Sequence, residues 1–319
     1  MSIATATPSA SVARAATDTS TVVSLDSGFV RRVADFAELC RPRIAVMTMV
    51  AVAVGFIVAS PISVQWLTLF WSMTGIVLLV AASSILNQVI ERRTDARMIR
   101  TADRPVAAGR VTVAEGTIAA FACIVAGFLL LVQFSTISAT WATVATLLVY
   151  VAGYTLLKFR TSLCTTIGAI PGAMPPVLGW LAAGGEFGVE ALSLFAIFFV
   201  WQFPHFLAIG WIHRHDYARA RLRMLPSFTD GGLLTGMLAV VYAAAFVPVS
   251  MMPGYVGLAG SAYVGTALVL SIVYLVFSIR FLAVRSVERA RRLMMVSLFV
   301  LPILLIVLVG EFVFLTSIR

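Results

Sequence analysis

Charged side chains are scarce in this sequence. Asp, Glu, Lys and Arg together make up 12% of its 319 residues, whereas 61% are hydrophobic, and the mean hydropathy is +1.01. A soluble domain of this composition would have too little polar surface to face water, so the composition excludes the soluble class and predicts a protein of the lipid bilayer. The formal net charge of +9 does not indicate a nucleic-acid partner, because the basic residues form short clusters between apolar segments.

Cysteine is also rare, and the N-terminus has almost no large apolar residues. Cys40, Cys123 and Cys164 are scattered, odd in number and without nearby histidines, which excludes a disulfide framework and a zinc site. Residues 1–28 are rich in Ala, Ser and Thr, and we interpret them as a disordered tail. They have no apolar run like that of a secretory signal peptide, so a cytoplasmic extension is a simpler interpretation than a transit peptide.

Long apolar segments fill the rest of the chain. A membrane-crossing helix needs about 20 apolar residues, and this length predicts one all-α domain over residues 29–319, a polytopic membrane protein with about nine transmembrane helices. An amphipathic segment, 29–42, is expected to lie along the membrane surface. The predicted spans lie near residues 43–60, 66–86, 113–132, 138–157, 163–182, 191–210, 233–252, 259–280 and 294–315.

Basic residues alternate strictly between the connections of these spans. Arg and Lys occur in the N-terminal region and at 87–112, 158–160, 214–223 and 280–292, whereas the connections between these have none. Cytoplasmic loops carry the excess of Lys and Arg. This alternation therefore predicts a cytoplasmic N-terminus and an external C-terminus, and the lack of a transit peptide favours a bacterial inner membrane over a mitochondrial one.

One charge-dense stretch, 87–105, follows the second span. If the helix continues, Asn87, Glu91 and Asp95 stand at i, i+4 and i+8 and project from one face, next to five arginines. Magnesium prefers oxygen ligands and usually binds through one or two carboxylates plus substrate phosphates, and arginines neutralise the remaining phosphate charge. A solvated loop, whose arginines follow the positive-inside rule and pair with its carboxylates, is an equally open alternative.

The fifth predicted span contains three prolines and two glycines within residues 165–176. Proline removes a backbone donor and clashes with the preceding turn, so this helix is expected to kink or break. Irregular backbone at membrane depth is tolerated only against protein or a cavity, which favours a helix that lines an internal pocket. Ordinary enrichment of proline and glycine in membrane helices is the alternative.

A second polar cluster covers residues 201–226 and contains all three histidines, His205, His213 and His215. Four spans separate it from the first cluster, and an even number places both clusters on the same membrane face. Polar groups inside a bundle are costly unless they are used, so the two clusters are expected to converge on one functional site. His213 and His215 have an interfacial alternative, and for His205 a structural role and a ligand contact are equally open.

A cation and a basic phosphate site that open into an apolar bundle suit an amphiphile with a diphosphate head and an isoprenoid tail. Magnesium and arginine would stabilise the negative charge of the departing diphosphate, and the bundle would shield an allylic cation from water. The sequence shows no arrangement typical of a nucleophilic Ser or Cys, and this chemistry needs none.

The motif Asn87-x3-Glu91-x3-Asp95-x2-Met98-x-Arg100-Thr101-x2-Arg104-Pro105 resembles the first signature of the intramembrane aromatic prenyltransferase superfamily. It is most similar to the haem branch of that superfamily, the protohaem farnesyltransferases. Three further stretches resemble the same branch in the same order, and the likeness runs from about residue 40 to the end. These stretches are 154–158, 172–180 and 201–226.

This resemblance implies helices around a central cavity, Mg²⁺ as cofactor, farnesyl diphosphate and haem b as substrates, and a product destined for terminal oxidases. Haem A synthase or a terminal-oxidase assembly would then be a further partner. Carried over by position, the implied roles are as follows: Asn87, Glu91 and Asp95 hold metal and diphosphate, Asp216 represents the second acidic motif, Arg100, Arg104 and Lys158 contact diphosphate oxygens, and His205 contacts haem.

Two positions depart from the family pattern. Glu91 stands where Asp is usual, and Arg221 and Arg223 stand where a small residue and a proline are expected. Two competing hypotheses therefore stay open. One is a prenyltransferase of the same superfamily that acts on a quinone precursor such as hydroxybenzoate. The other, from a different class, is a transporter or a non-catalytic haem-handling assembly factor.

Overall fold

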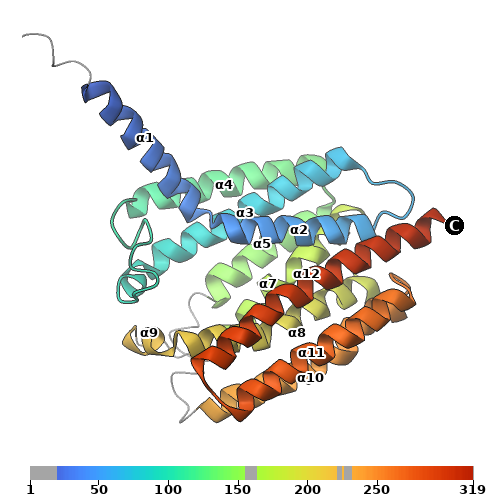
Figure 1. Ribbon diagram of the computed structural model, residues 1–319. Helices are drawn as coiled ribbons and strands as arrows, with labels where there is room; N and C mark the ends of the chain where they lie inside the picture. Colours follow the sequence, from blue (N-terminus) through green and yellow to red (C-terminus); the bar gives the residue numbers. More distant parts are fainter. Residues whose placement is uncertain (1–19, 155–163, 221–224, 226–231, 319) are drawn as a thin grey trace, which may run out of the picture.

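The computed structural model describes residues 20–154, 164–220, 225 and 232–318, and the regular elements in these ranges are helices (Figure 1). This confirms the predicted all-α class. The helices are α1 Ser20–Leu39, α2 Pro42–Val58, α3 Trp66–Asp95, α4 Val113–Phe134, α5 Ile137–Leu148 with the π-helix η1 Val149–Tyr154, α7 Cys164–Ala182, α8 Val189–Ile212, α9 Arg214–Arg219, α10 Leu233–Tyr255, α11 Ser261–Ala283 and α12 Val287–Ser317.

Six of these helices are long and apolar enough to cross a membrane, namely α3, α4, α8, α10, α11 and α12. A seventh span results if Gly28–Leu39 and Pro42–Val58, which meet at 50°, are counted as one. Every predicted span overlaps a helix of the structure. The count of six or seven membrane-crossing helices covers only the described residues, so the total of nine spans stays a prediction. The helix α1 extends N-terminal of the amphipathic segment predicted at 29–42, and residues 1–19 of the predicted tail lie outside the described residues.

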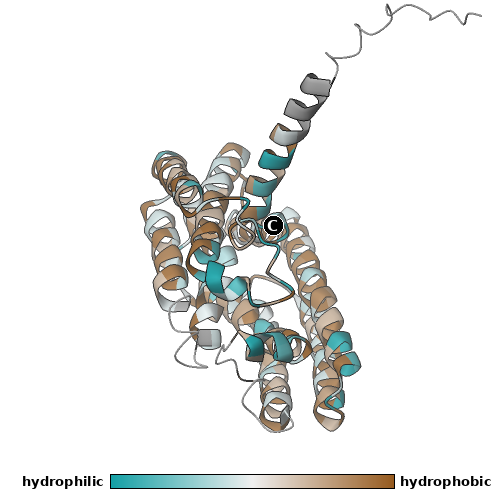
Figure 2. Ribbon diagram, turned by 90° about the vertical axis from the view of Figure 1, so that its left-hand side faces the viewer, coloured by the Kyte–Doolittle hydropathy of each residue, from teal (hydrophilic) through white to brown (hydrophobic). Residues whose placement is uncertain are grey.

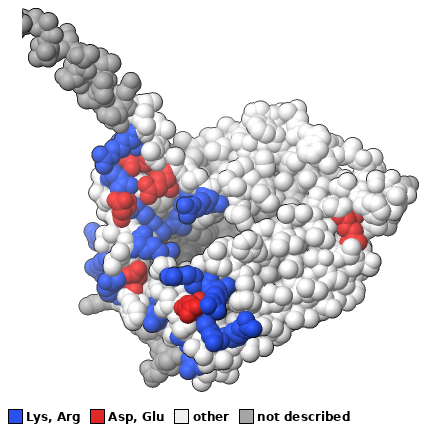
Figure 3. All heavy atoms as spheres, in the orientation of Figure 1, with Lys and Arg blue, Asp and Glu red and all other residues white. Residues whose placement is uncertain are grey.

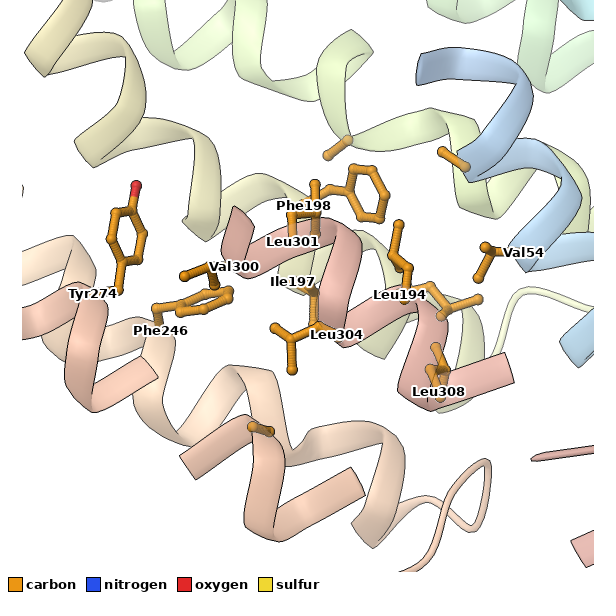
Figure 4. Packing of buried hydrophobic residues seen from close by; sticks show 14 of the residues in the cluster. Val54, Leu194, Ile197, Phe198, Phe246, Tyr274, Val300, Leu301, Leu304 and Leu308 are labelled. Carbon is orange, nitrogen blue, oxygen red and sulfur yellow. The ribbon is translucent and has the colours of Figure 1, made fainter. Parts of the chain in front are cut away.

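The transmembrane helices lie side by side, and α1 projects away from them (Figure 1). The closest neighbours are α3 with α4, α2 with α7, and α10 with α8 and α11, while α12 packs on both α11 and α8. The largest apolar cluster joins α2, α7, α8, α10, α11 and α12, and Figure 4 shows Phe198, Phe246 and Leu301 within it. Large apolar side chains also lie on the outside, with Phe121 66% and Ile306 71% exposed, and hydrophobic residues (brown in Figure 2) run along most of the helices. Such faces suit lipid rather than water.

Small residues allow the backbones of α2 and α7 to touch. A Cβ atom at Gly55 would lie 1.8 Å from the carbonyl oxygen of Pro176, and one at Gly179 would lie 2.0 Å from that of Val52. Helices in a membrane have no hydrophobic driving force between them, so close backbone contact and polar bridges supply the association. One such bridge joins α8 to α7, because Gln202 Nε2 donates to the carbonyl oxygen of Ala169 at 2.7 Å.

The fifth predicted span, for which a kink or a break is expected, does not break, and the kink stays a prediction. The helix α7 runs from Cys164 to Ala182 with Pro171, Pro175 and Pro176 inside it. Prolines are tolerated in membrane helices where neighbouring helices and their side chains satisfy the freed backbone groups. Here α7 packs against α2, η1 and α8, and these contacts hold its course.

We expect Gly55→Ala to lower the free energy of unfolding by about 1–3 kcal/mol, because the added methyl group meets backbone that has no rotamer to change. Gly265→Ala is the matched control, since Gly265 lies in α11 with nothing within 4 Å of its ideal Cβ position. Thermal unfolding of both purified proteins in the same detergent measures the difference. Equal midpoints for the two variants would contradict the α2–α7 contact.

Candidate active site

The C-terminal end of α3 carries the predicted oxygen cluster. The helix continues past its apolar part to Asp95, so Asn87, Glu91 and Asp95 share one face as the spacing predicts. All three are buried, with exposed fractions of 3%, 3% and 1%. Asn87 Nδ2 donates to Glu91 Oε1, which orients both side chains on that face. The alternative of a solvated loop is wrong at these three positions.

Asp95 is the residue with an unfilled bonding site. Its Oδ2 accepts from Arg104 Nη1 at 2.7 Å, but its buried Oδ1 has no hydrogen-bond partner among the described residues. A buried acceptor left without a partner costs free energy, more so when it is charged. A cation beside Oδ1 would remove that cost.

The donor set fits magnesium that is shared with a substrate. The described residues contain no group of three or more His, Cys, Asp or Glu side chains suited to a metal ion. In this described part of the site, the oxygen donors are the carboxylates of Glu91 and Asp95 and the amide of Asn87. Magnesium usually takes one or two carboxylates and completes its shell with waters and substrate phosphates. The residues therefore fit a metal that arrives with a phosphate ligand rather than a closed protein cage.

The connection 96–112 places Arg104 over this cluster. Thr101 Oγ1 donates to the carbonyl oxygen of Asp95 at 3.0 Å and closes the first turn of the connection. Farther along, Arg110 reaches Asp35 at 2.7 Å and Asp103 at 2.8 Å. These hydrogen bonds, that to Asp35 above all, raise the pKa of the Arg110 guanidinium. Since Asp35 belongs to α1, its ion pair with Arg110 fastens the connection to α1.

Arg41 joins the site although the sequence analysis assigned it no role. Its guanidinium lies within electrostatic range of Glu91, Asp95, Arg104 and Tyr150. Its backbone is left-handed, with φ 50°, a conformation that non-glycine residues adopt at a cost and that clusters at functional sites. The sequence did contain a signal for the position of Arg41. An arginine directly before a proline at the start of a predicted span stands at the N-terminus of a helix.

Two tyrosines from distant elements also reach the cluster. Tyr150 belongs to η1, and π-helical turns inside helices occur frequently at functional sites. Tyr217 belongs to α9 and is 8% exposed. Arg100 Nη2 donates to its hydroxyl at 3.4 Å, and the Arg100 guanidinium lies 5.9 Å from the ring centroid. Burial raises the pKa of Tyr217, whereas Arg100 and Arg104 oppose that shift.

The second polar cluster therefore meets the first, as the even number of spans predicts. Met98 packs against Tyr217 and Ala220 in one small apolar cluster. Asp216, on the same helix as Tyr217, forms an ion pair with Arg219. The pKa of His213 is lowered, first by burial and then by the positive charge of Arg100. The negative charge of Asp216 opposes this shift but does not cancel it.

His205 lies on α8 against α12. Its ring stacks on Trp201 with centroids 5.2 Å apart, and its Nδ1 lies 2.6 Å from Ser297 Oγ. Ser297 Oγ also lies within hydrogen-bond distance of the carbonyl oxygen of Met294. In the tautomer in which the Ser297 hydroxyl donates to Met294, Nδ1 donates to Ser297 and Nε2 keeps a lone pair. The imidazole is held by Ser297 and Trp201, and in that tautomer its Nε2 can accept a hydrogen bond or ligate a metal.

Some predicted residues lie outside the described part of the chain, namely Lys158 with 155–157, Arg221, Arg223 and Pro226. On the described surface, arginine side chains gather at one end of the molecule beside a hollow near its middle (Figure 3). The site residues occupy that end, where α3, the 96–112 connection, the start of α2 and α9 meet.

The sequence pattern of the UbiA prenyltransferase family matches residues 48–305. The chain belongs to this family. Among its relatives are the protoheme IX farnesyltransferase of Koribacter versatilis (strain Ellin345), 38% identical over 289 residues that cover 86% of this chain and 92% of the relative, and that of Solibacter usitatus (strain Ellin6076), 37% identical over 279 residues with 85% and 96% coverage.

Solved structures agree with UbiA membership at the level of the fold. A structure of a digeranylgeranylglyceryl phosphate synthase has a TM-score of 0.74 at 15% identity and covers 89% of this chain and 99% of its own. A UbiA homologue from Archaeoglobus fulgidus bound to GPP and Mg²⁺ has a TM-score of 0.59 at 14% identity, with 86% and 99% coverage. The family identifies the chain as an integral membrane prenyltransferase.

We expect Asp95→Asn to weaken divalent cation binding at least about tenfold, because it removes the charge of the carboxylate whose Oδ1 awaits a partner. The measurement is the electron paramagnetic resonance signal of free Mn²⁺ titrated with purified protein and inorganic diphosphate. Asp103→Asn is the control, since the Asp103 side chain is 96% exposed in the same connection. An unchanged Mn²⁺ affinity in Asp95→Asn would remove Asp95 from the metal site.

Proposed function

We propose that this UbiA-family protein transfers the farnesyl group of farnesyl diphosphate to a vinyl group of haem b. The observation that carries the proposal is the buried set of Asn87, Glu91 and Asp95 under Arg104, in a chain that is 38% identical to a protoheme IX farnesyltransferase over most of its length. The oxygen cluster and the arginines suit a diphosphate, and the relatives' names supply the acceptor and the prenyl donor. The catalytic domain is proposed to span residues 29–319.

The chain's own residues bind and orient the diphosphate. Arg104 is anchored by Asp95, Arg100 lies over Tyr217, and Arg41 faces the same cluster from the start of α2. Together with Lys158 they would donate to diphosphate oxygens, since guanidinium groups match phosphate geometry. Mg²⁺, held by Asn87, Glu91 and Asp95, would supply positive charge that stabilises the leaving diphosphate.

In the proposed reaction the allylic carbon–oxygen bond breaks and the diphosphate leaves with its electron pair. The vinyl group of haem attacks the farnesyl carbon, water adds to the resulting cation and a proton is released, which leaves a hydroxyethylfarnesyl side chain. No protein nucleophile takes part. The apolar bundle excludes bulk water from the allylic cation until the vinyl group has attacked.

His205 is proposed as the contact to haem. Ser297 and Trp201 hold its ring, and the Nε2 lone pair suits the haem iron or a proton on the acceptor. Asp216 is proposed to act from the rim of the site, where its pairing with Arg219 limits its role as a metal ligand.

We place the site on the cytoplasmic face of a bacterial inner membrane, with the N-terminus on that side and the C-terminus outside. The support is the concentration of basic side chains at one end of the molecule (Figure 3), which follows the positive-inside rule. The product would pass to haem A synthase or to an assembling terminal oxidase.

Purified protein given haem b, farnesyl diphosphate and magnesium should yield haem heavier by one farnesyl group plus water, as measured by mass spectrometry. EDTA should abolish the product, because the leaving diphosphate loses its counter-charge. A Glu91→Ala, Asp95→Ala double variant that folds in membranes should lose at least about 99% of the rate, and full activity in it would contradict catalysis at this site. Unmodified haem alongside a prenylated hydroxybenzoate would favour the quinone-precursor hypothesis instead.

Arg41→Gln should raise the KM for farnesyl diphosphate about tenfold or more, because a charge-assisted hydrogen bond to the diphosphate is lost. Arg43→Gln is the matched control: it removes the same charge two residues away, at an exposed position. Steady-state kinetics at saturating haem compare the two variants. The role of Arg41 is refuted if both variants show the wild-type KM.

A further inference from the structure

A basic cleft lies where α11 ends and α12 begins, on elements that contribute no residue to the oxygen cluster. Its inner part is a cavity of about 270 Å³ lined by Phe277, Arg280, Arg289 and Arg292. A second cavity of about 420 Å³ shares Phe277 and Arg292 with the first. The two form one continuous feature, the α11–α12 cleft, whose second part is further lined by Glu288, Arg291, Met295 and Val296.

The arginines of the α11–α12 cleft are held in place by the protein. The Arg280 guanidinium lies 5.4 Å from the centroid of the Phe277 ring. Arg289 Nη1 donates to the carbonyl oxygen of Arg280 at 3.1 Å, which joins the two helices. Arg292 pairs with Glu288 one turn away. The side chains of Arg280, Arg289 and Arg292 therefore line a common space, with the Arg292 side chain 64% exposed at its rim.

Positive charge in the cleft exceeds its own counter-charge. Four arginines and one glutamate line the two cavities, so three positive charges are left over when each counts one unit. Like charges that line one cleft repel one another, although water screens part of the repulsion at exposed positions. An anion that enters the cleft removes the repulsion and can use several guanidinium donors at once.

The cleft is apolar as well as basic, which decides the kind of anion. Its second part continues along α12 past Met295, which is 46% exposed, and the outer faces beyond it carry Val276 at 39% and Phe299 at 63% exposure. These side chains belong to spans long and apolar enough to cross a membrane, so they face acyl chains. A basic pocket at the end of two such helices, open to an apolar groove, matches a phospholipid headgroup with its chain.

We propose that the α11–α12 cleft binds one anionic phospholipid, with the phosphate held by Arg280, Arg289 and Arg292 and an acyl chain laid along Phe277 and Met295. The bound lipid then attaches the connection between α11 and α12, which contains Arg285, to the membrane. Zwitterionic lipid is disfavoured, because its ammonium group would stand among four guanidinium groups.

Native mass spectrometry of the full chain tests this, with equal amounts of phosphatidylglycerol and phosphatidylcholine in the micelle. The wild type is expected to retain one phosphatidylglycerol with at least about tenfold preference over phosphatidylcholine. An Arg280→Gln, Arg289→Gln, Arg292→Gln triple variant should lose that preference. The matched control removes the same charge from three exposed arginines outside the cleft, Arg31→Gln, Arg93→Gln and Arg97→Gln, and should keep it.

A second variant covers the case in which the triple variant does not fold. Met295→Trp keeps every arginine but fills the apolar part of the cleft, and it should reduce phosphatidylglycerol retention several-fold without changing net charge. The proposal is overturned if the triple variant retains phosphatidylglycerol as the control does, or if Met295→Trp leaves retention unchanged. Loss of haem retention in the triple variant, with lipid retention intact, would likewise overturn it in favour of a haem propionate site.

Discussion

Burial of carboxylates at the end of a transmembrane helix is the constraint on which the rest of the site depends. Glu91 and Asp95 are 3% and 1% exposed, and such groups are strongly destabilising unless opposite charges lie beside them. Arg104 meets Asp95 directly, and Arg41 faces both carboxylates from another helix. Among the residues that the structure describes, Asp95 Oδ1 still has no hydrogen-bond partner, so a further cation beside it would remove the remaining cost.

The position of Arg104 depends in turn on a helix that projects away from the bundle. The 96–112 connection follows α3 and precedes α4, and its far end is held by Arg110, which reaches Asp35 on α1. Arg32 of α1 also donates to the carbonyl oxygen of Arg110 at 2.7 Å. Because Asp35 is 8% exposed, this ion pair is shielded from water and worth more than a surface pair. The amphipathic helix thus contributes to the site through the connection it fastens.

Rules that apply to the sequence of a single segment predicted the structural features that depend on that segment. The length of the apolar runs predicted the helices, the i, i+4, i+8 spacing predicted the shared face of Asn87, Glu91 and Asp95, and the count of spans predicted that the 201–226 region would meet it. Arg41, Tyr150 and Tyr217 were missed because each reaches the cluster only through the packing of distant elements. Of the kink or break expected in α7, the break was wrong for the same reason, since the proline rule describes one helix without its neighbours.

The positive-inside rule accounts for the gathering of arginines at one end of the molecule. It does not account for the partner that each arginine side chain has. Arg104 and Arg110 are matched by carboxylates of the chain, as interior ion pairs must be. In the α11–α12 cleft four arginines share one glutamate, so topology alone would leave a repulsive cluster without purpose. An excess of charge held in place by cation–π and backbone contacts indicates that its counter-ion comes from outside the chain. In the proposed function the counter-ion at the site on α3 is a substrate diphosphate, and in the proposed lipid site between α11 and α12 it is an anionic phospholipid.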